Sequence, residues 1–272
     1  MYKNRKIDFD KIHNSSFEGW GFSFRRSQLY RFKKYINLLR KYKVKGRVLD
    51  IGCSTGFFSN RFLKPLFNEV IAIDVSEVAI RKAKEKYPGI KFIKGSLLNI
   101  NFCEEMFDCI TLLEVLYYLN DYEQNEYLKK IAKLLKEDGY FLISVNIGSK
   151  PYFNKEEIKN LLKKYFYILE EDGIYIKTYY KFIEEPLYLL LKLISSPLPI
   201  KIKESDSIIK KIVKYVVNFV FRNKYAYYSY GFFLQYLLKF ILFIIPIEII
   251  DFISKKISKD ELSIYIAICK KK

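Results

Sequence analysis

The sequence has little of what a metal site or a disulfide framework requires. One histidine, His13, is present in 272 residues, and the four cysteines include no pair with C-x-x-C spacing. Zinc sites are built from clusters of cysteine and histidine, so we expect no metal site, and unpaired cysteines are typical of a reducing cytosol. The N-terminal residues MYKNRKIDFD are charged and lack the apolar core of a signal peptide, so we expect a cytoplasmic protein.

The net charge of +18 is unevenly distributed along the chain. Residues 1–45 carry 13 Lys+Arg and 3 Asp+Glu (net +10), residues 46–175 carry 18 and 19 (net −1), and residues 176–272 carry 17 and 8 (net +9). Such an uneven distribution of charge gives information about binding partners rather than about the fold. Two interpretations stay open: the basic ends meet an anionic partner, or their lysines cover solvated faces.

The middle of the chain alternates between two kinds of hydrophobic pattern. Short apolar runs predict buried strands over 47–52, 69–76, 90–95, 107–115 and 140–147. Between them, Ser76 caps a predicted helix that ends before Pro88, and residues 121–136 form an amphipathic helix followed by a turn that ends at Gly139. Alternating strands and helices predict an α/β fold with a parallel sheet covered on both faces, and ligands bind at the carboxyl ends of its strands.

The segment VLDIGCSTGFFS, residues 48–59, joins the first predicted strand to the first helix. Its spacing is D-x-G-x-x-x-G, from Asp50 through Gly52 to Gly56, rather than the G-x-G-x-x-G of dinucleotide-binding proteins. An acid directly before the first glycine would repel a phosphate and attract an ammonium or sulfonium group. The turn therefore favours a bulkier, cationic ligand.

These features resemble the class I S-adenosylmethionine-dependent methyltransferases over about residues 45–147. VLDIGCSTG is similar to the first motif of that family, Asp74 to the acid that ends its second strand, and FDCITLLEVLYYL and LLKEDGYFLISV to its fourth and fifth strands. The run EVLYYLND is locally similar to nodulation-type N-methyltransferases. The resemblance implies a Rossmann-like, mostly parallel sheet whose last strand is antiparallel, and S-adenosylmethionine as cofactor.

By this resemblance, the first turn surrounds the methionine portion of the cofactor, Asp74 binds the ribose, and Val75 lies against adenine. Ser96 stands where the family often has an aspartate, and Ser54 replaces the middle glycine of the motif. A serine at a position that requires a positive φ is disfavoured by about 1 kcal/mol. The residues implied to bind the cofactor are Asp50, Gly52, Cys53, Ser54, Gly56, Asp74, Val75, Ser96, Leu97 and Leu113.

Methyl transfer from a sulfonium requires in-line positioning in a dry site, and a hydroxyl acceptor usually also needs a base. The polar candidates beside the methyl group are Glu114, Tyr117 and Tyr118, just after the fourth predicted strand. His13 is a further candidate base because its imidazole titrates near neutral pH. Each candidate also has an ordinary structural interpretation, as a helix cap or a surface residue.

The chain is predicted to divide into three parts. Residues 1–45 form a basic helical arm, residues 46–175 with 261–272 form the methyltransferase domain, and residues 176–260 form a helical insertion before the last strand. The insertion contains a short apolar helix (187–194), a basic amphipathic helix (207–222), and an apolar run (231–246) that is too short to span a membrane comfortably and carries Lys239. It could form a substrate lid, lie on an anionic membrane surface through 206–250, form a dimer interface, or pack as a plain helical subdomain.

The sequence therefore predicts a cytoplasmic methyltransferase that acts on N or O of a small or lipid-linked acceptor, with peripheral attachment to the inner membrane face left open. Two alternatives remain: an RNA methyltransferase or nucleic-acid binder that uses the basic ends, and a methyltransferase-like scaffold without cofactor. The N/D-P-P-Y/F motif of nucleic-acid N-methylases is absent; LEVLY stands in its place.

Overall fold

The computed structural model describes residues 7–14, 25–149, 152–179, 247–257 and 262–272, together with a few single positions between 180 and 246. By its contacts the chain divides into two compact units, one made of residues 1–14, 31–175 and 251–272 and the other of residues 15–30 and 176–250. The first unit contains the whole sheet and is described below.

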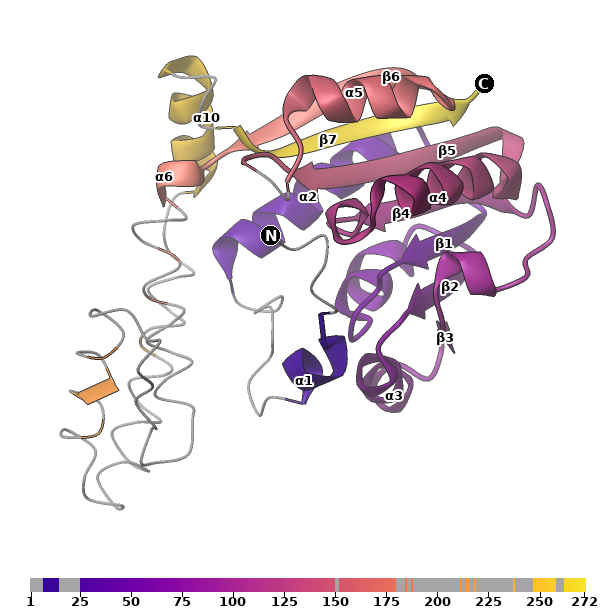
Figure 1. The fold of residues 1–272 in the computed structure, drawn as a ribbon, viewed down its shortest axis with the longest axis horizontal. Helices are drawn as coiled ribbons and strands as arrows, with labels where there is room; N and C mark the ends of the chain where they lie inside the picture. Colours follow the sequence, from indigo (N-terminus) through magenta and orange to yellow (C-terminus); the bar gives the residue numbers. More distant parts are fainter. Residues whose placement is uncertain are drawn as a thin grey trace. The chain divides into compact units, whose positions relative to one another are not determined.

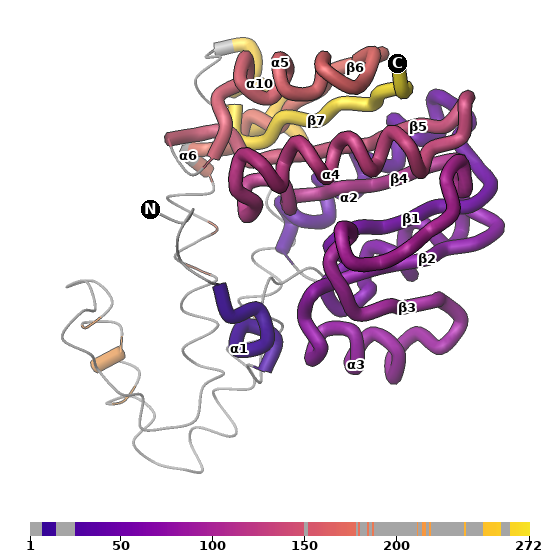
Figure 2. The backbone as a smooth tube through the Cα atoms, turned by 45° about the vertical axis from the view of Figure 1, so that its right-hand side comes forward, coloured from indigo at the N-terminus to yellow at the C-terminus, as the bar shows by residue number. Residues whose placement is uncertain are grey.

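The first unit is built on one seven-stranded sheet with the strand order β3-β2-β1-β4-β5-β7-β6 (Figures 1 and 2). β1 to β5 run parallel, and β7 is antiparallel to both of its neighbours, β5 and β6. The strands are β1 (Arg47–Ile51), β2 (Glu69–Asp74), β3 (Lys91–Lys94), β4 (Phe107–Leu113), β5 (Leu135–Asn146), β6 (Phe166–Tyr175) and β7 (Leu262–Lys271). This is the sheet that the resemblance implied, including its antiparallel last strand.

Helices cover both faces of the sheet. α4 and α5 lie on one face and α2 on the other (Figure 1). The α-helices of the described residues are α1 (Phe9–His13), α2 (Arg26–Lys41), α3 (Glu77–Lys86), α4 (Asp121–Leu134), α5 (Lys155–Lys163), α6 (Lys177–Tyr179) and α10 (Ile247–Ile257). Short turns of other helix types are η1 (Ser59–Leu63), η2 (Leu97–Asn99) and η3 (Leu116–Tyr118).

The two faces of the sheet differ in chemistry because successive residues of a strand point to opposite sides. On the α4 and α5 side, fully buried apolar residues of the strands, such as Ile110 and Phe141, share one core with Leu128 of α4 and Leu162 of α5. On the other side, β1, β4 and β5 present buried polar residues: Asp50, Thr111 and Ser144. The apolar face holds the layers together, and the polar face leads to the site.

Most predicted elements are confirmed, and two details differ. α4 ends at Leu134 rather than at residue 136, because the chain passes directly into β5 at Leu135. Gly139 consequently lies within β5 instead of ending a turn, at a point where the pairing of β4 with β5 shifts its register between Phe107 and Cys109. A Cβ on Gly139 would lie 3.1 Å from the carbonyl oxygen of Phe107, so glycine permits the close approach of the two strands.

The predicted helices of the insertion at 187–194, 207–222 and 231–246 lie outside the described residues, apart from single positions. No helix of the described part combines the length and the apolar character needed to cross a bilayer.

α4 begins with a complete capping box, which supplies the first prediction. The Asn120 side chain accepts from the amide of Glu123 at 2.9 Å, and the Glu123 carboxylate accepts from the amide of Asn120 at 2.9 Å. We expect Asn120→Ala to lower the free energy of unfolding by about 1 kcal/mol, because a helix-end amide loses its partner. Urea unfolding measures this, with the exposed Asn99→Ala as the control that leaves stability unchanged.

Candidate active site

The candidate site lies where β1, β2 and β4 end, at the carboxyl edge of the sheet. The turn after β1 is tied to β2: the amides of Gly52 and Cys53 donate to the carbonyl oxygen of Ile73 at 2.8 and 3.0 Å. The amide of Gly56 then donates to the carbonyl oxygen of Cys53 at 3.0 Å and closes the turn before η1. These hydrogen bonds within the protein fix the backbone of the turn.

Both motif glycines are required by space as well as by conformation. Gly52 has φ +78° and Gly56 has φ +75°, in the left-handed region that side chains disfavour. A Cβ on Gly52 would lie 2.3 Å from Cγ2 of Val115, and one on Gly56 would lie 2.6 Å from Cζ of Phe92. The turn therefore packs against the loop after β4 on one side and against β3 on the other.

Ser54 occupies the middle position of the motif with φ +51°, so the strained conformation considered from the sequence is present. Its amide donates to Oδ2 of Asp74 at 2.8 Å, a charge-assisted bond that offsets part of this strain. Its hydroxyl oxygen is buried and has no hydrogen-bond partner among the described residues. A buried polar atom without a partner, next to the predicted ligand, is an available contact for a polar ligand group.

Asp74 ends β2 and joins two loops. Its Oδ2 accepts from the Ser54 amide, and its Oδ1 accepts from the Ser76 amide at 2.9 Å. Burial raises the pKa of this carboxyl, while the two backbone bonds act in the opposite direction. Each oxygen keeps a second lone-pair direction, so the carboxylate can still accept from the hydroxyls of a sugar.

Asp50 lies beneath the turn rather than at its surface. It is 3% exposed, and its two oxygens accept from the hydroxyls of Ser59 at 2.6 Å and Thr111 at 2.7 Å. Burial raises the pKa of its carboxyl to about 6. The side chain therefore braces β1 against η1 and β4.

The residues implied to contact adenine divide into exposed and buried ones. Val75 is 48% exposed and offers an apolar surface directly after Asp74. The Ser96 hydroxyl lies 2.7 Å from that of Tyr127 in α4, where the family often has an acid. Leu97 has no exposed surface and belongs to the apolar core, so its side chain supports this region from within. Leu113, half-buried, ends β4 and pairs with Ser144 of β5.

Glu114 follows β4 with φ +61°, a conformation that places its side chain in a buried polar cluster. Its Oε1 accepts from the Ser144 hydroxyl at 2.8 Å, and that hydroxyl accepts from Tyr35 of α2 at 2.7 Å. Its Oε2 lies 3.4 Å from the Tyr117 hydroxyl and 3.8 Å from Nη1 of Arg31. Burial raises the pKa of this carboxyl, and Arg31 opposes that effect.

Aromatic rings border this carboxylate. The rings of Tyr117 and Tyr118 have centroids 4.5 Å apart, and Phe9 of α1 meets Tyr118 edge-on at 5.3 Å. The hydroxyl of Tyr117 accepts from Nδ2 of Asn146 at 3.1 Å. Glu114 and Tyr118, two of the predicted catalytic residues, therefore belong to neighbouring parts of one aromatic and acidic region.

α1 connects this region to the Asp74 side of the edge. Asp10 accepts from the Ser76 hydroxyl at 2.5 Å and from the Val78 amide at 3.2 Å, at the start of α3. His13 is 6% exposed, and its carbonyl oxygen accepts from Lys82. Burial lowers the pKa of the His13 imidazole, and the charge of Asp74 opposes this. The carboxylate whose charge acts most strongly on His13 is therefore Asp74, the predicted ribose acid. The other two predicted catalytic residues, Glu114 and Tyr118, lie after β4 instead.

Several members of the site carried no local signal in the sequence. Arg31 and Tyr35 come from α2, which precedes the first motif, and Ser144 lies within an ordinary buried strand.

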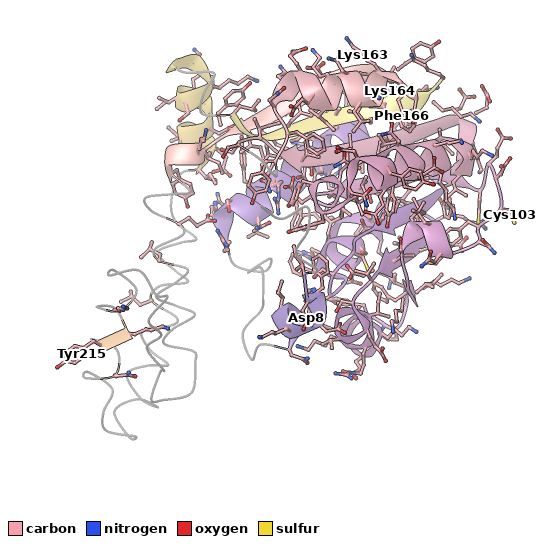
Figure 3. All side chains as sticks on the ribbon, viewed as in Figure 1. Asp8, Cys103, Lys163, Lys164, Phe166 and Tyr215 are labelled. Atoms are coloured by element: carbon pink, nitrogen blue, oxygen red, sulfur yellow. The ribbon has the colours of Figure 1, made fainter. Side chains whose placement is uncertain are left out.

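Among the described residues, no group of three or more His, Cys, Asp or Glu side chains could hold a metal ion. Cys103, the one exposed cysteine, lies in the loop before β4, well away from α1, where Asp8 is marked (Figure 3).

A family profile described as "Methyltransferase domain" matches residues 48–139. A protein of Geobacillus sp. (strain WCH70) named as a methyltransferase is 31% identical over 154 residues, which are 53% of this chain and 57% of that protein. The malonyl-[acyl-carrier protein] O-methyltransferase 1 of Ilyobacter polytropus is 32% identical over 114 residues, 40% of this chain and 41% of that protein. The chain thus spans less than two thirds of the length of these relatives.

Solved structures share the fold at low sequence identity. The N-methyltransferase NodS from Bradyrhizobium japonicum WM9, in complex with S-adenosyl-L-homocysteine, gives a TM-score of 0.55 at 22% identity over 60% of this chain and 86% of NodS. The MccD protein gives 0.52 at 16% identity over 88% of this chain and 97% of MccD. These similarities concern the architecture of the sheet and its helices.

The close packing of the first glycine supplies a test. We expect Gly52→Ala to lower the free energy of unfolding by about 3 kcal/mol, because the new methyl group overlaps Val115 and the positive φ is strained. Gly148→Ala is the matched control, since its Cβ would meet Tyr152 at an ordinary 3.5 Å. Equal stability of the two variants in urea unfolding would contradict this description of the turn.

The raised pKa of Asp50 supplies a second test. The carboxyl of Asp50 has a pKa of 3.8 in the unfolded chain and about 6 in the folded protein. Between these two pH values the folded state binds more protons than the unfolded state. Lowering the pH through this range therefore stabilises the folded state. From pH 7 to pH 4.5 the wild type should gain stability relative to Asp50→Asn by about 2 kcal/mol, since pH 4.5 lies about 1.5 pH units below the folded pKa and still above the unfolded one. Urea unfolding of both proteins at the two pH values measures the difference; a gap independent of pH would contradict the assignment.

Proposed function

We propose that this chain is an S-adenosylmethionine-dependent methyltransferase that methylates N or O of a small or lipid-linked acceptor, since a methyltransferase-domain profile matches residues 48–139. The observation that carries the proposal is the position of Asp74. Its carboxylate ends β2, and two backbone amides from different loops hold it in place. A fixed acid at this edge is suited to binding the two hydroxyls of a ribose.

The residues around Asp74 fit the remainder of the cofactor. Gly52 and Gly56 shape the turn after β1 with their positive φ angles, and the hydroxyl of Ser54 is buried there without a partner among the described residues. The exposed side chain of Val75 provides an apolar surface for a base. When bound, S-adenosylmethionine supplies a methyl group that its sulfonium already activates for transfer.

The acceptor is proposed to lie beside Glu114 and Tyr118. A carboxyl whose pKa is raised by burial accepts a proton more readily than an exposed one, which suits an acceptor that loses its proton on methylation. The Ser144 hydroxyl and the Arg31 guanidinium lie beside the Glu114 carboxylate, and the rings of Tyr117 and Tyr118 border it. A neutral amine needs no proton removed before attack, so the same cluster serves N and O acceptors.

Nucleic-acid binding is less well supported by the described surface. Several of its lysines face acidic partners, including Lys41 with Glu170 at 2.6 Å and Lys94 with Glu77 at 2.6 Å. Lysines that are paired in this way present a weaker field to a phosphate backbone than unpaired ones would.

The cofactor proposal is tested by calorimetric titration with S-adenosyl-L-homocysteine. We expect binding by the wild type and a loss of affinity of about 10- to 100-fold in Asp74→Ala, because the hydrogen bonds to the ribose disappear and the amides of Ser54 and Ser76 lose the carboxylate that positions them. Asp138→Ala removes an exposed acid that pairs with Lys270 and should bind like the wild type. A folded wild type that does not bind would refute the cofactor and favour a scaffold without chemistry.

A further inference from the structure

The helix α10 (Ile247–Ile257) buries an acidic residue beside Ile247 and exposes a row of large apolar residues. Phe252 is 59% exposed, Ile253 47% and Ile249 57%, whereas the acidic Asp251 is 3% exposed. Large apolar residues spaced i, i+3 and i+4 normally form the buried stripe of a surface helix. Here the stripe points outward and a charge points inward, which is an arrangement that marks an interaction surface. We call Ile249, Phe252, Ile253 and Lys256 the α10 face.

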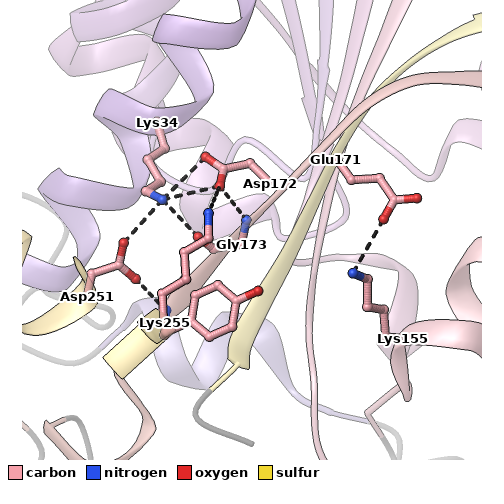
Figure 4. Close-up of polar contacts among 8 residues, drawn as sticks. Lys34, Lys155, Glu171, Asp172, Gly173, Asp251 and Lys255 are labelled. Carbon is pink, nitrogen blue, oxygen red and sulfur yellow. Dashed lines mark hydrogen bonds and ion pairs between the residues drawn. The ribbon is translucent and has the colours of Figure 1, made fainter. Parts of the chain in front are cut away.

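The inward charge is held by a network that fixes the orientation of the helix (Figure 4). Asp251 lies 3.2 Å from Nζ of Lys34 in α2 and accepts from the amide of Tyr175 in β6. Lys34 also lies 3.3 Å from Asp172 and donates to the carbonyl oxygen of Gly173 at 2.8 Å. Both side chains are largely buried, so breaking the pair would leave an uncompensated charge. The helix cannot rotate to bury Phe252 without that loss.

The chemistry of this face distinguishes a lipid surface from a protein partner. Lys256 lies over the ring of Phe252, with Nζ 4.4 Å from the centroid, whereas Lys255 turns toward β6, where its Nζ lies 3.8 Å from Asp172. Protein–protein interfaces are depleted in lysine, whereas amphipathic helices on membranes combine aromatic and aliphatic residues with lysine. The chain as a whole carries +18, and anionic headgroups complement that charge.

We propose that the α10 face docks on the surface of an anionic phospholipid bilayer, with Phe252 and Ile253 at the boundary of the acyl chains and Lys256 among the phosphates. The apolar run at 231–246, which directly precedes α10 in the sequence and follows the tyrosine-rich 225–230, has a composition that suits the same interface. This surface uses none of the residues assigned to cofactor or acceptor, so it stands independently of the proposed methyl transfer.

The test is sedimentation of the full chain with vesicles of phosphatidylglycerol and phosphatidylcholine, compared with phosphatidylcholine alone. We expect binding to the anionic vesicles, reduced at least tenfold in Phe252→Ser/Ile253→Ser and about fivefold in Lys256→Gln, at roughly 1 kcal/mol per lysine. The matched controls lie on α4: Tyr122→Ser, whose ring is 74% exposed, and the exposed Lys129→Gln should bind like the wild type.

Two further measurements keep the outcomes distinct. Hydrogen exchange of the wild type should slow within 247–257 when anionic vesicles are added, and S-adenosyl-L-homocysteine titration of each variant reports the cofactor site separately. Vesicle binding that is unchanged in the Phe252→Ser/Ile253→Ser variant overturns the proposal. Self-association of the wild type that this variant abolishes, with no slowing of exchange on vesicles, also overturns it and identifies a second copy of the chain as the occupant.

Discussion

The carboxylate of Asp74 is the contact on which the arrangement of the carboxyl edge depends. It accepts from the amide of Ser54 after β1 and from the amide of Ser76 before α3, so one side chain fixes two loops from different strands. Asp10 of α1 then binds the hydroxyl of the same Ser76. Without Asp74, two buried amides would lose their partner together, and the turn that contains the strained Ser54 would lose the bond that holds it.

The two faces of the sheet have different roles: one stabilises the fold, and the other supports the candidate site. The α4 and α5 side of the sheet is a largely apolar core, which stabilises the layers. Its α2 side carries Asp50, Thr111 and Ser144, and their hydrogen bonds lead outward to Glu114 and to the turn after β1. Polar networks that are buried and satisfied hold their members in one geometry, which is what a site requires of its supports.

The sequence was sufficient for features that are encoded locally. Strand periodicity, the cap at Ser76 and the glycine spacing of the turn each depend on neighbouring residues, and the structure has them where they were expected. The buried position of Asp50 and the tie from Ser144 to Tyr35 depend on contacts between strands and helices distant in the sequence. The burial of Asp251 in α10 could not be predicted from the sequence either. It depends on the ion pair with Lys34, which lies more than 200 residues earlier in the chain.

The order of strands has a consequence for how the chain is made. β6 lies at one edge of the sheet and pairs only with β7, which enters between β5 and β6 although it comes last in the chain. During synthesis β6 leaves the ribosome long before its partner does, and at roughly 5–20 residues per second it must wait several seconds for residues 262–271. Throughout that time the edge of β5 is open as well. The sheet therefore stays half-built, with unpaired strand edges, until residues 262–271 have been made.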